Sequence, residues 1–301
     1  MKRFFCIALM TLTVSAQSPK PDPQFLQQIE QFRSLRAKNL SAPDGWLSLV
    51  ALQWLKPGDT TVGSAPGNTL HLDHAPAHLA TLHLANDIVT LVPPAGGFSA
   101  GVTLDGKPAT SSKLSFDENH PSSELRYNGL LMIVIKRGDR LYLRVKDAQA
   151  PTRTNFHGLN WYPPDPRFVV TAKWIPSNPP HTLTIPNVLG QISHEASPGV
   201  AEFTLNGQTL RLEPVIEDPA DQKLFFIFRD TTSTTTTYQA GRFLYTSLPS
   251  NGLDKPGTVV LDFNRIQNPP CVYTAFATCP LPPQQNRLNI AIPAGEKRYH
   301  N

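Results

Sequence analysis

Short runs of alternating hydrophobic residues, each closed by turn residues, fill most of the chain after residue 60. The first group of runs occupies residues 69–72, 79–84, 88–92 and 102–104. Turn pairs such as Asn86-Asp87 and Asp105-Gly106 separate these runs, and a period of two is typical of strands with one buried face. Because no helical pattern intervenes, the runs predict antiparallel sheets that form a sandwich or a barrel.

A second group of strands is predicted after a polar connection at residues 110–123. It comprises residues 129–135, 140–145, 167–174, 201–205, 210–212 and 224–228. The 301 residues include 30 prolines, about twice the usual share, which favours short strands joined by Pro-rich turns. We therefore predict an all-β protein in which an N-terminal helix precedes two β-sandwich- or barrel-like parts. The smaller part covers residues 45–115 and the larger covers residues 125–299.

One helical pattern precedes the strands, at residues 22–40. Phe25, Ile29 and Phe32 recur at three- and four-residue spacing, and Asp22-Pro23 is a plausible start of the helix. We expect this helix, within a segment that spans residues 17–44, to pack its apolar face on the first sheet as a structural lid.

The N-terminus has the layout of a secretory signal peptide. Lys2 and Arg3 precede an apolar run at residues 4–14, and small residues end at Ala16. The run is about half of the ~20 residues that a membrane-spanning helix needs. We therefore expect cleavage after residue 16, export to the periplasm or the medium, and no membrane-spanning segment in the mature chain.

The charge of the chain argues against two classes of partner. The formal net charge is +4, and the loss of Lys2 and Arg3 with residues 1–16 would reduce it to +2 (4 − 2). No run of five like charges occurs. Nucleic acid and anionic membrane surfaces are therefore not expected as partners, because both recruit concentrated positive charge.

Several short motifs follow one another in the second half of the chain. They include Ile135-Lys-Arg137-Gly138-Asp139, Phe228-Arg-Asp230-Thr231, Ala240-Gly241-Arg242-Phe243-Leu244, Leu261-Asp262-Phe263-Asn264, Asn268-Pro-Pro-Cys271, Asn286-Arg287-Leu288 and Ala294-Gly295-Glu296. Together with Gly45-Trp46-Leu47, this order resembles the bacterial family catalogued as domain of unknown function 1684, over residues 40–297. The resemblance implies an all-β protein and no established activity.

Residues 62–106 also resemble a forkhead-associated sandwich. The resemblance lies in Val62-Gly63-Ser64, Asn68, Ala75-Pro76-Ala77-His78 and Leu104-Asp105-Gly106. In that family an Arg after the glycine and a Ser before the His hold phosphothreonine. Ser64 and Ala75-Pro76 stand in those places here, so the resemblance implies a sandwich without phosphopeptide binding.

Cys271 and Cys279 are the two cysteines that would remain in a mature chain. A disulfide is favoured in an exported protein, and closing a nine-residue loop would stabilise the fold by roughly 2.5 kcal/mol. A metal site and a reduced or reactive pair are the alternatives. We expect no metal, because no further Cys or His stands at close ligand spacing, and no cofactor, because no cofactor motif occurs.

Polar residues at strand ends and turns form the predicted ligand site. They are Arg137, Arg144, Asp230, Arg242, Asp262, Asn264, Asn268, Asn286, Arg287 and Glu296. Because arginine presents a planar fork of donors, we predict binding of a small polar or acidic ligand, such as a saccharide, near residues 261–296. The alternative is an internal network that holds this Pro-rich segment in place. The expected pairs are Asp230 with Arg242 and Asp262 with Arg287.

Two other functions are also compatible with the sequence. Asp262 and Glu296 would serve a hydrolase if their carboxyl groups lay ~5–9.5 Å apart in an open cleft. A purely structural envelope protein would need no concave polar pocket. The threonine-rich run at residues 231–237 is predicted to be an exposed hairpin tip. No motif decides whether the protein is an enzyme.

Overall fold

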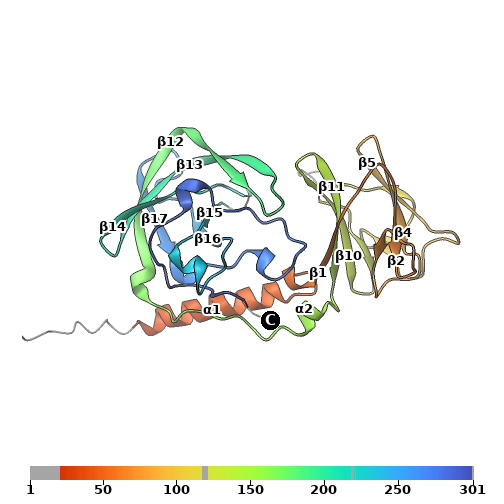
Figure 1. Ribbon diagram of the computed structural model, residues 1–301, viewed down its shortest axis with the longest axis horizontal. Helices are drawn as coiled ribbons and strands as arrows, with labels where there is room; N and C mark the ends of the chain where they lie inside the picture. Colours follow the sequence, from red (N-terminus) through yellow and green to blue (C-terminus); the bar gives the residue numbers. More distant parts are fainter. Residues whose placement is uncertain (1–20, 117–120, 218–219, 221, 300–301) are drawn as a thin grey trace, which may run out of the picture.

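The computed structural model describes residues 21–116, 121–217, 220 and 222–299, and it consists of two lobes that lie side by side (Figure 1). The predicted signal peptide lies outside the described residues. Strands make up 42% of the protein and helical residues 15%. The chain therefore forms a mostly-β protein, as predicted at the level of class. The described sheets are open rather than closed into a barrel.

The first lobe contains two sheets around one hydrophobic core. The six-stranded sheet has the order β1 (Leu49–Trp54), β11 (Arg140–Asp147), β10 (Leu130–Arg137), β9 (Leu125–Tyr127), β6 (Thr103–Leu104) and β7 (Lys107–Pro108). The five-stranded sheet has the order β3 (Leu70–His71), β2 (Gly58–Gly63), β4 (Ala80–Ala85), β5 (Ile88–Val92) and β8 (Ser112–Lys113). Residues from both sheets, such as Leu82 and Val145, share the core because alternate side chains point inward.

The turns of this lobe form as their sequences predict. Asn86 and Asp87 have φ angles of 50° and 59°, and Asp105 and Gly106 have 51° and 78°. Positive φ at both central residues is what a tight hairpin turn needs, and Asn, Asp and Gly tolerate it best.

The division between the lobes differs from the prediction. β10 and β11 were expected in the second part, but β11 pairs with β1, with Arg144 opposite Leu52, so both strands belong to the first lobe. The sheets of the first lobe therefore end at Asp147 rather than near residue 115. Turn signals in a sequence are local and do not show which distant strand completes a sheet.

The second lobe contains a four-stranded and a two-stranded sheet. The first has the order β14 (Gln208–Leu212), β13 (Ile192–Leu205), β12 (Val169–Pro186) and β17 (Gly257–Asp262), and the second pairs β15 (Lys223–Phe228) with β16 (Arg242–Ser247). β15 lies between two cores, because Phe226 and Phe228 face one while Phe225 and Ile227 face the other. Short helices complete the structure: α2 (Pro151–Thr154), η1 (Trp46–Ser48), η2 (Pro166–Phe168), η4 (Thr231–Thr234), η5 (Phe263–Arg265), η6 (Pro270–Val272) and η7 (Gln284–Asn286).

Helix α1 (Pro23–Leu40) begins as predicted but packs elsewhere. The Asp22 side chain accepts a hydrogen bond from the Gln24 backbone N at 3.2 Å. The helix runs along the second lobe (Figure 1), where the Phe32 ring meets Trp161 at 6.0 Å. The expectation that it covers the first sheet is wrong, because periodicity identifies the apolar face of a helix but not the surface that receives it. No helix in the described part of the chain is long and apolar enough to cross a bilayer.

Candidate functional site

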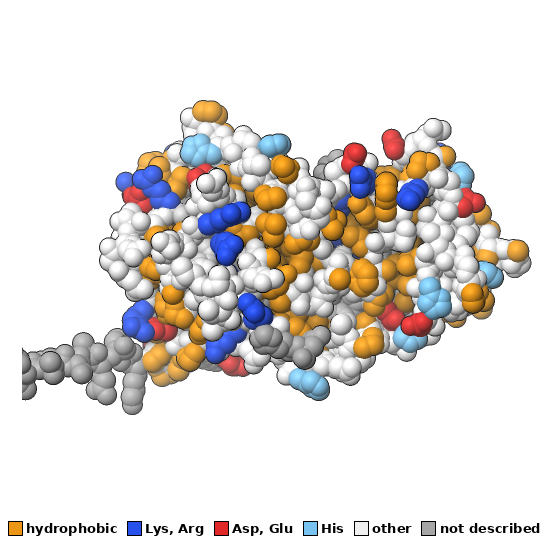
Figure 2. Space-filling view, viewed as in Figure 1, with side chains coloured by type: hydrophobic (Ala, Val, Ile, Leu, Met, Phe, Trp, Pro, Cys, Tyr) orange, Lys and Arg blue, Asp and Glu red, His pale blue; other side chains and the backbone are white. Residues whose placement is uncertain are grey.

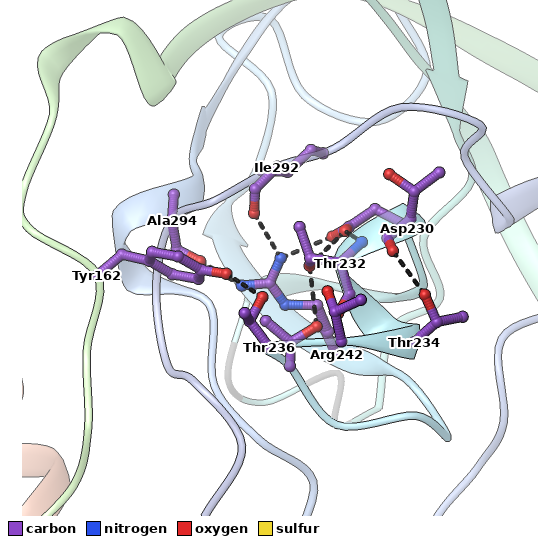
Figure 3. A network of polar contacts seen from close by, with 11 residues as sticks. Tyr162, Asp230, Thr232, Thr234, Thr236, Arg242, Ile292 and Ala294 are labelled. Carbon is purple, nitrogen blue, oxygen red and sulfur yellow. Dashed lines mark hydrogen bonds and ion pairs between the residues drawn. The ribbon is translucent and has the colours of Figure 1, made fainter.

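Arg242 and Asp230 form the predicted ion pair, and the pair is enclosed by protein. Arg242 Nη1 lies 2.6 Å from Asp230 Oδ2, and the two side chains are 1% and 0% exposed. The same guanidinium donates to the backbone carbonyls of Ile292, at 2.8 Å, and of Ala294 (Figure 3). Arg242 thus holds the C-terminal segment against the start of β16 and has no face open to a ligand.

The threonine-rich run lies in the connection between β15 and β16 and completes this network with its buried residues. Asp230 accepts hydrogen bonds from Thr232 N, at 2.7 Å, and from Thr232 Oγ1. The Thr232 hydroxyl also meets the Thr237 hydroxyl at 2.9 Å, and both residues are buried. The run thus forms part of a hairpin connection, as predicted, and Thr231 and residues 234–236 are exposed. Its other residues are buried, because the carboxylate of Asp230 supplies the acceptor that lets the Thr232 hydroxyl be buried at low cost.

Glu296 is buried among three donors. Arg36 Nε lies 2.9 Å from its Oε1, while Asn268 N and Tyr273 Oη lie 2.6 Å and 3.0 Å from its Oε2. Burial, and then the charge of Glu296, raise the pKa of Tyr273 well above its ordinary value. The carboxylate therefore ties α1 to the end of the chain and does not face an open cleft.

Asp262 and Arg287 do not form the expected pair. Asp262 Oδ2 accepts from Arg265 Nε at 2.9 Å, three residues later, and its Oδ1 accepts from Asn264 N at 3.1 Å. Arg287 Nε instead donates to the carbonyl of Pro282 at 3.4 Å. Asp262 is the residue immediately before helix η5, and its side chain accepts a hydrogen bond from the first turn of that helix. Its partners are therefore local in the sequence.

Among the described residues, two of the three buried asparagines, Asn264 and Asn286, each bind one backbone segment through both ends of the amide. Asn264 accepts from Asp165 N at 2.8 Å and donates to Asp165 O at 3.0 Å. Asn286 makes the same pair of bonds with Glu213, at 2.9 and 2.8 Å. Each amide thereby pairs with a backbone N–H and C=O that a neighbouring strand would otherwise satisfy. The buried members of the predicted set fit the alternative of an internal network, whereas Arg287 is exposed.

Cys271 and Cys279 are joined by a disulfide, as predicted, with their Cα atoms 6.1 Å apart. The bond closes a loop, residues 271–279, that reaches the first lobe. Thr274 Oγ1 donates to the Leu49 carbonyl at 3.1 Å, and Cys279 shares a hydrophobic cluster with Leu49. Among the described residues, no three His, Cys, Asp or Glu side chains gather as metal ligands.

A groove of about 400 Å³ lies where this disulfide loop meets the first lobe. Figure 2 shows hydrophobic side chains gathered along the boundary between the lobes. The lining comes from β1 and β11, from the turn between β12 and β13, and from the disulfide loop, and it includes Trp54, Arg140, Tyr142, Leu189, Gln191 and Phe276. Its volume is in the range of small-molecule sites, and it contains no Asp or Glu.

Alternation along β11 brings arginines to the groove. Arg140, Tyr142 and Arg144 point to the same face of the six-stranded sheet, because Leu141 and Leu143 face the core of the first lobe. The register places Arg137 opposite Arg140 on this face. The turn between β10 and β11 meets the turn between β12 and β13, where Gly138 lies against the Gln191 side chain. Arg137 Nε also reaches Thr278 Oγ1 of the disulfide loop, at 3.3 Å.

Arg144 has no counter-charge in the described part of the chain. Its Nε is buried without a hydrogen-bond partner, and its guanidinium lies 5.4 Å from the centre of the Trp46 ring. Burial, and then the charge of Arg137, lower the pKa of Arg144 to about 10. Neither Arg137, Arg140 nor Arg144 forms an ion pair among the described residues. Arg140 lines the groove, while Arg137 and Arg144 lie on the same face of the sheet beside it, so this face carries uncompensated positive charge.

A larger hollow, of about 540 Å³, lies beside α2 and is lined by residues that include Asn155, His157, Asn160 and Tyr299. It has no arginine, lysine or carboxylate in its lining. The smaller groove contains an arginine, so it is the better candidate for binding a charged ligand.

None of the residues that line the groove was predicted, and the predicted Arg137 and Arg144 lie beside it. Trp54, Tyr142 and Phe276 are scattered along the chain and come together through strand register and the disulfide loop. The alternation of Arg140, Tyr142 and Arg144 is the signal in the sequence that marks this face.

Comparison with known proteins identifies the second lobe. Residues 154–297 match the family described as "Protein of unknown function (DUF1684)". This DUF1684 segment contains the buried networks and the disulfide loop, while Arg137, Arg140 and Arg144 precede it. A solution NMR structure of an uncharacterized protein from Haloarcula marismortui is 30% identical, over 48% of this chain and 78% of that one, with a TM-score of 0.41. No curated protein matches the chain. The forkhead-associated resemblance receives no support from these comparisons.

Proposed function

We propose that the protein binds a small organic anion in the groove between its lobes. The acidic group of the ligand is held by Arg144, and the charge of Arg137 adds to the attraction. The observation that carries this proposal is Arg144, a half-buried cation with a second arginine beside it and no carboxylate partner in the described chain.

The charge balance of the site favours an anion. A buried charge without a partner costs free energy, and a neighbouring like charge adds to that cost. A carboxylate or phosphate at the Arg144 guanidinium would form charge-assisted hydrogen bonds and offset both costs. The groove beside them supplies room for the remainder of the ligand.

The expected location belongs to the proposal. The signal-like N-terminus favours export, and a disulfide favours an oxidising compartment. The ligand is therefore a small anion met in the periplasm or outside the cell.

A titration of the purified protein with simple anions tests the proposal. Acetate, benzoate, phosphate and glucuronate would be titrated calorimetrically at low ionic strength. At least one anion is expected to bind, and Arg144→Gln should weaken that binding at least tenfold. Arg126→Gln is the matched control, because Arg126 lies in the same sheet but pairs with Glu124 at 2.9 Å. Absence of binding by every anion, or equal binding by the Arg144→Gln variant, would contradict the proposal.

A structural envelope protein is the second candidate. The enclosed networks around Arg242 and Glu296 favour it, since they fix the C-terminal segment without leaving a polar pocket there. This candidate predicts that no anion binds. The hydrolase alternative loses its basis, because Glu296 is buried under Arg36 instead of facing a cleft.

A further inference from the structure

We infer that the anion is a carboxylic acid with an aromatic or other apolar body, and not an acidic saccharide. This inference rests on the function proposed above and adds the chemical class of the ligand.

The polar groups of the groove are too few for a sugar. A sugar hydroxyl is both a donor and an acceptor, so a buried sugar needs acceptors from the protein. Arg140 offers none, and the side-chain oxygen of Gln191 already accepts from Asn187 Nδ2 at 3.0 Å. The hydroxyl of Tyr142 is the other side-chain acceptor of the lining. Burying several hydroxyl groups here would leave most of them unpaired, at a cost of roughly 1–3 kcal/mol each.

The aromatic surface that a sugar ring would use is already occupied. Sugar recognition commonly stacks the ring on an exposed indole, and Trp54 is the indole of this groove. The Arg140 guanidinium lies 4.6 Å and the Lys56 ammonium 5.2 Å from the centre of the Trp54 ring. A stacked sugar would have to displace these cations from the ring face.

The remaining lining is apolar and partly exposed. Phe276 belongs to the disulfide loop and Leu189 to the β12–β13 turn. Their side chains are 39% and 52% exposed, respectively. Covering such side chains gains about 25 cal/mol for each Å² of apolar surface removed from water. An aromatic or alkyl body gains this free energy without needing hydrogen-bond partners.

The spacing along β11 sets the size of the ligand. Alternate residues of a strand lie about 7 Å apart, so Arg144 and Tyr142 are separated by about the length of a benzoate ion. Arg140 lies about 7 Å further, at the outer end of the groove. A carboxylate at Arg144 would therefore place a single ring beside Tyr142, with Phe276 and Leu189 as the walls of the groove.

Calorimetric titration with three matched acids tests the inference. 3-Phenylpropanoate is expected to bind at least tenfold more tightly than acetate, which lacks the apolar body, and than glucuronate, which replaces it with hydroxyls. Phe276→Ala and Leu189→Ala should each weaken phenylpropanoate binding by about three- to tenfold and leave acetate binding unchanged. Leu26→Ala, on α1, is the control, because Leu26 is also 39% exposed but lies outside the groove lining.

The outcomes separate the two proposals. If glucuronate binds as tightly as phenylpropanoate and Arg144→Gln abolishes both, the groove binds anions but the inferred ligand class is wrong. If no acid binds, the proposed function itself fails. If phenylpropanoate binds equally well to Phe276→Ala, Leu189→Ala and the wild type, its body does not lie in this groove and the inference is overturned.

Discussion

Arg242 and Asp230 face each other across 2.6 Å, with neither side chain more than 1% exposed. Removing one partner leaves the other charge buried without compensation. We expect Arg242→Met to lower the free energy of unfolding by about 3–5 kcal/mol, measured by chemical denaturation. Arg265→Met is the matched control, because the Arg265–Asp262 pair is partly exposed and should contribute less than about 1 kcal/mol. A loss below 1 kcal/mol for Arg242→Met would show that the pair does not organise the lobe.

Arg144→Met is expected to behave in the opposite way. Burial and Arg137 lower the pKa of Arg144 to about 10, so the folded state disfavours its cationic form. This unfavourable contribution is present at neutral pH and fades as the pH rises above about 10, because only the unfolded chain still holds the proton there. The substitution should leave the free energy of unfolding unchanged or raise it by roughly 1 kcal/mol at pH 7. A loss of several kcal/mol would indicate that Arg144 already has a partner.

Tyr273 gives a prediction for alkaline pH. Burial and Glu296 raise its pKa well above the ordinary value, so above pH ~10 the unfolded chain releases the phenolic proton while the folded chain retains it. Its contribution to stability is therefore complete below about pH 10 and falls by roughly 1.4 kcal/mol per pH unit above that. We expect Tyr273→Phe to lower the free energy of unfolding by about 1.5–3 kcal/mol at pH 7, because the hydrogen bond to Glu296 is lost. Between pH 10 and 12, the free energy of unfolding of this variant should decline less steeply than that of the wild type. Parallel profiles for the two proteins would refute this assignment.

The disulfide should affect both stability and binding. Replacing Cys271 and Cys279 together by serine removes the closure of a nine-residue loop, which is worth about 2.5 kcal/mol in free energy of unfolding. The same loop carries Phe276 and Thr278 at the groove, so phenylpropanoate binding should weaken as well. Reduction of the wild-type protein is expected to reproduce both effects. Unchanged binding after the loss of the disulfide would mean that the loop holds its shape through its contacts with Leu49.

The strands were largely predictable because alternation is local. β5 forms at Ile88–Val92, as its sequence predicts, and β11 extends the predicted run by two residues, to Asp147. The pairing of β11 with β1 was not predictable, because it joins segments about ninety residues apart. The strand β16 was also missed, since its outward and inward residues are almost all buried and show no alternation.

The site was predictable only in part, because the sequence shows residue types and local spacing but not the distant partner of each side chain. The density of special residues after Arg242 predicts a segment held by internal contacts, and the structure shows buried hydrogen bonds along it, such as those of Arg242 and Glu296. Residue type alone does not show whether an Asn faces backbone, as Asn264 does, or a ligand. Arg144 was predicted as a binding residue for its chemistry, but its lack of a counter-charge becomes visible only with the structure.

The attachment of α1 has a consequence for the order of synthesis and folding. Arg36 is synthesised early, whereas Glu296, whose carboxylate accepts a hydrogen bond from it, lies 260 residues further along the chain. The backbone carbonyl of Asn268, which accepts from the same guanidinium at 3.0 Å, is also made late. During translation the helix can meet Trp161 and Tyr162 once the middle of the chain has emerged, but both partners of Arg36 are made late, so this part of its attachment is among the closing events of folding. A chain released before residue 296 would keep the contacts of its first helix with residues 161–162 and lack the ion pair with Glu296.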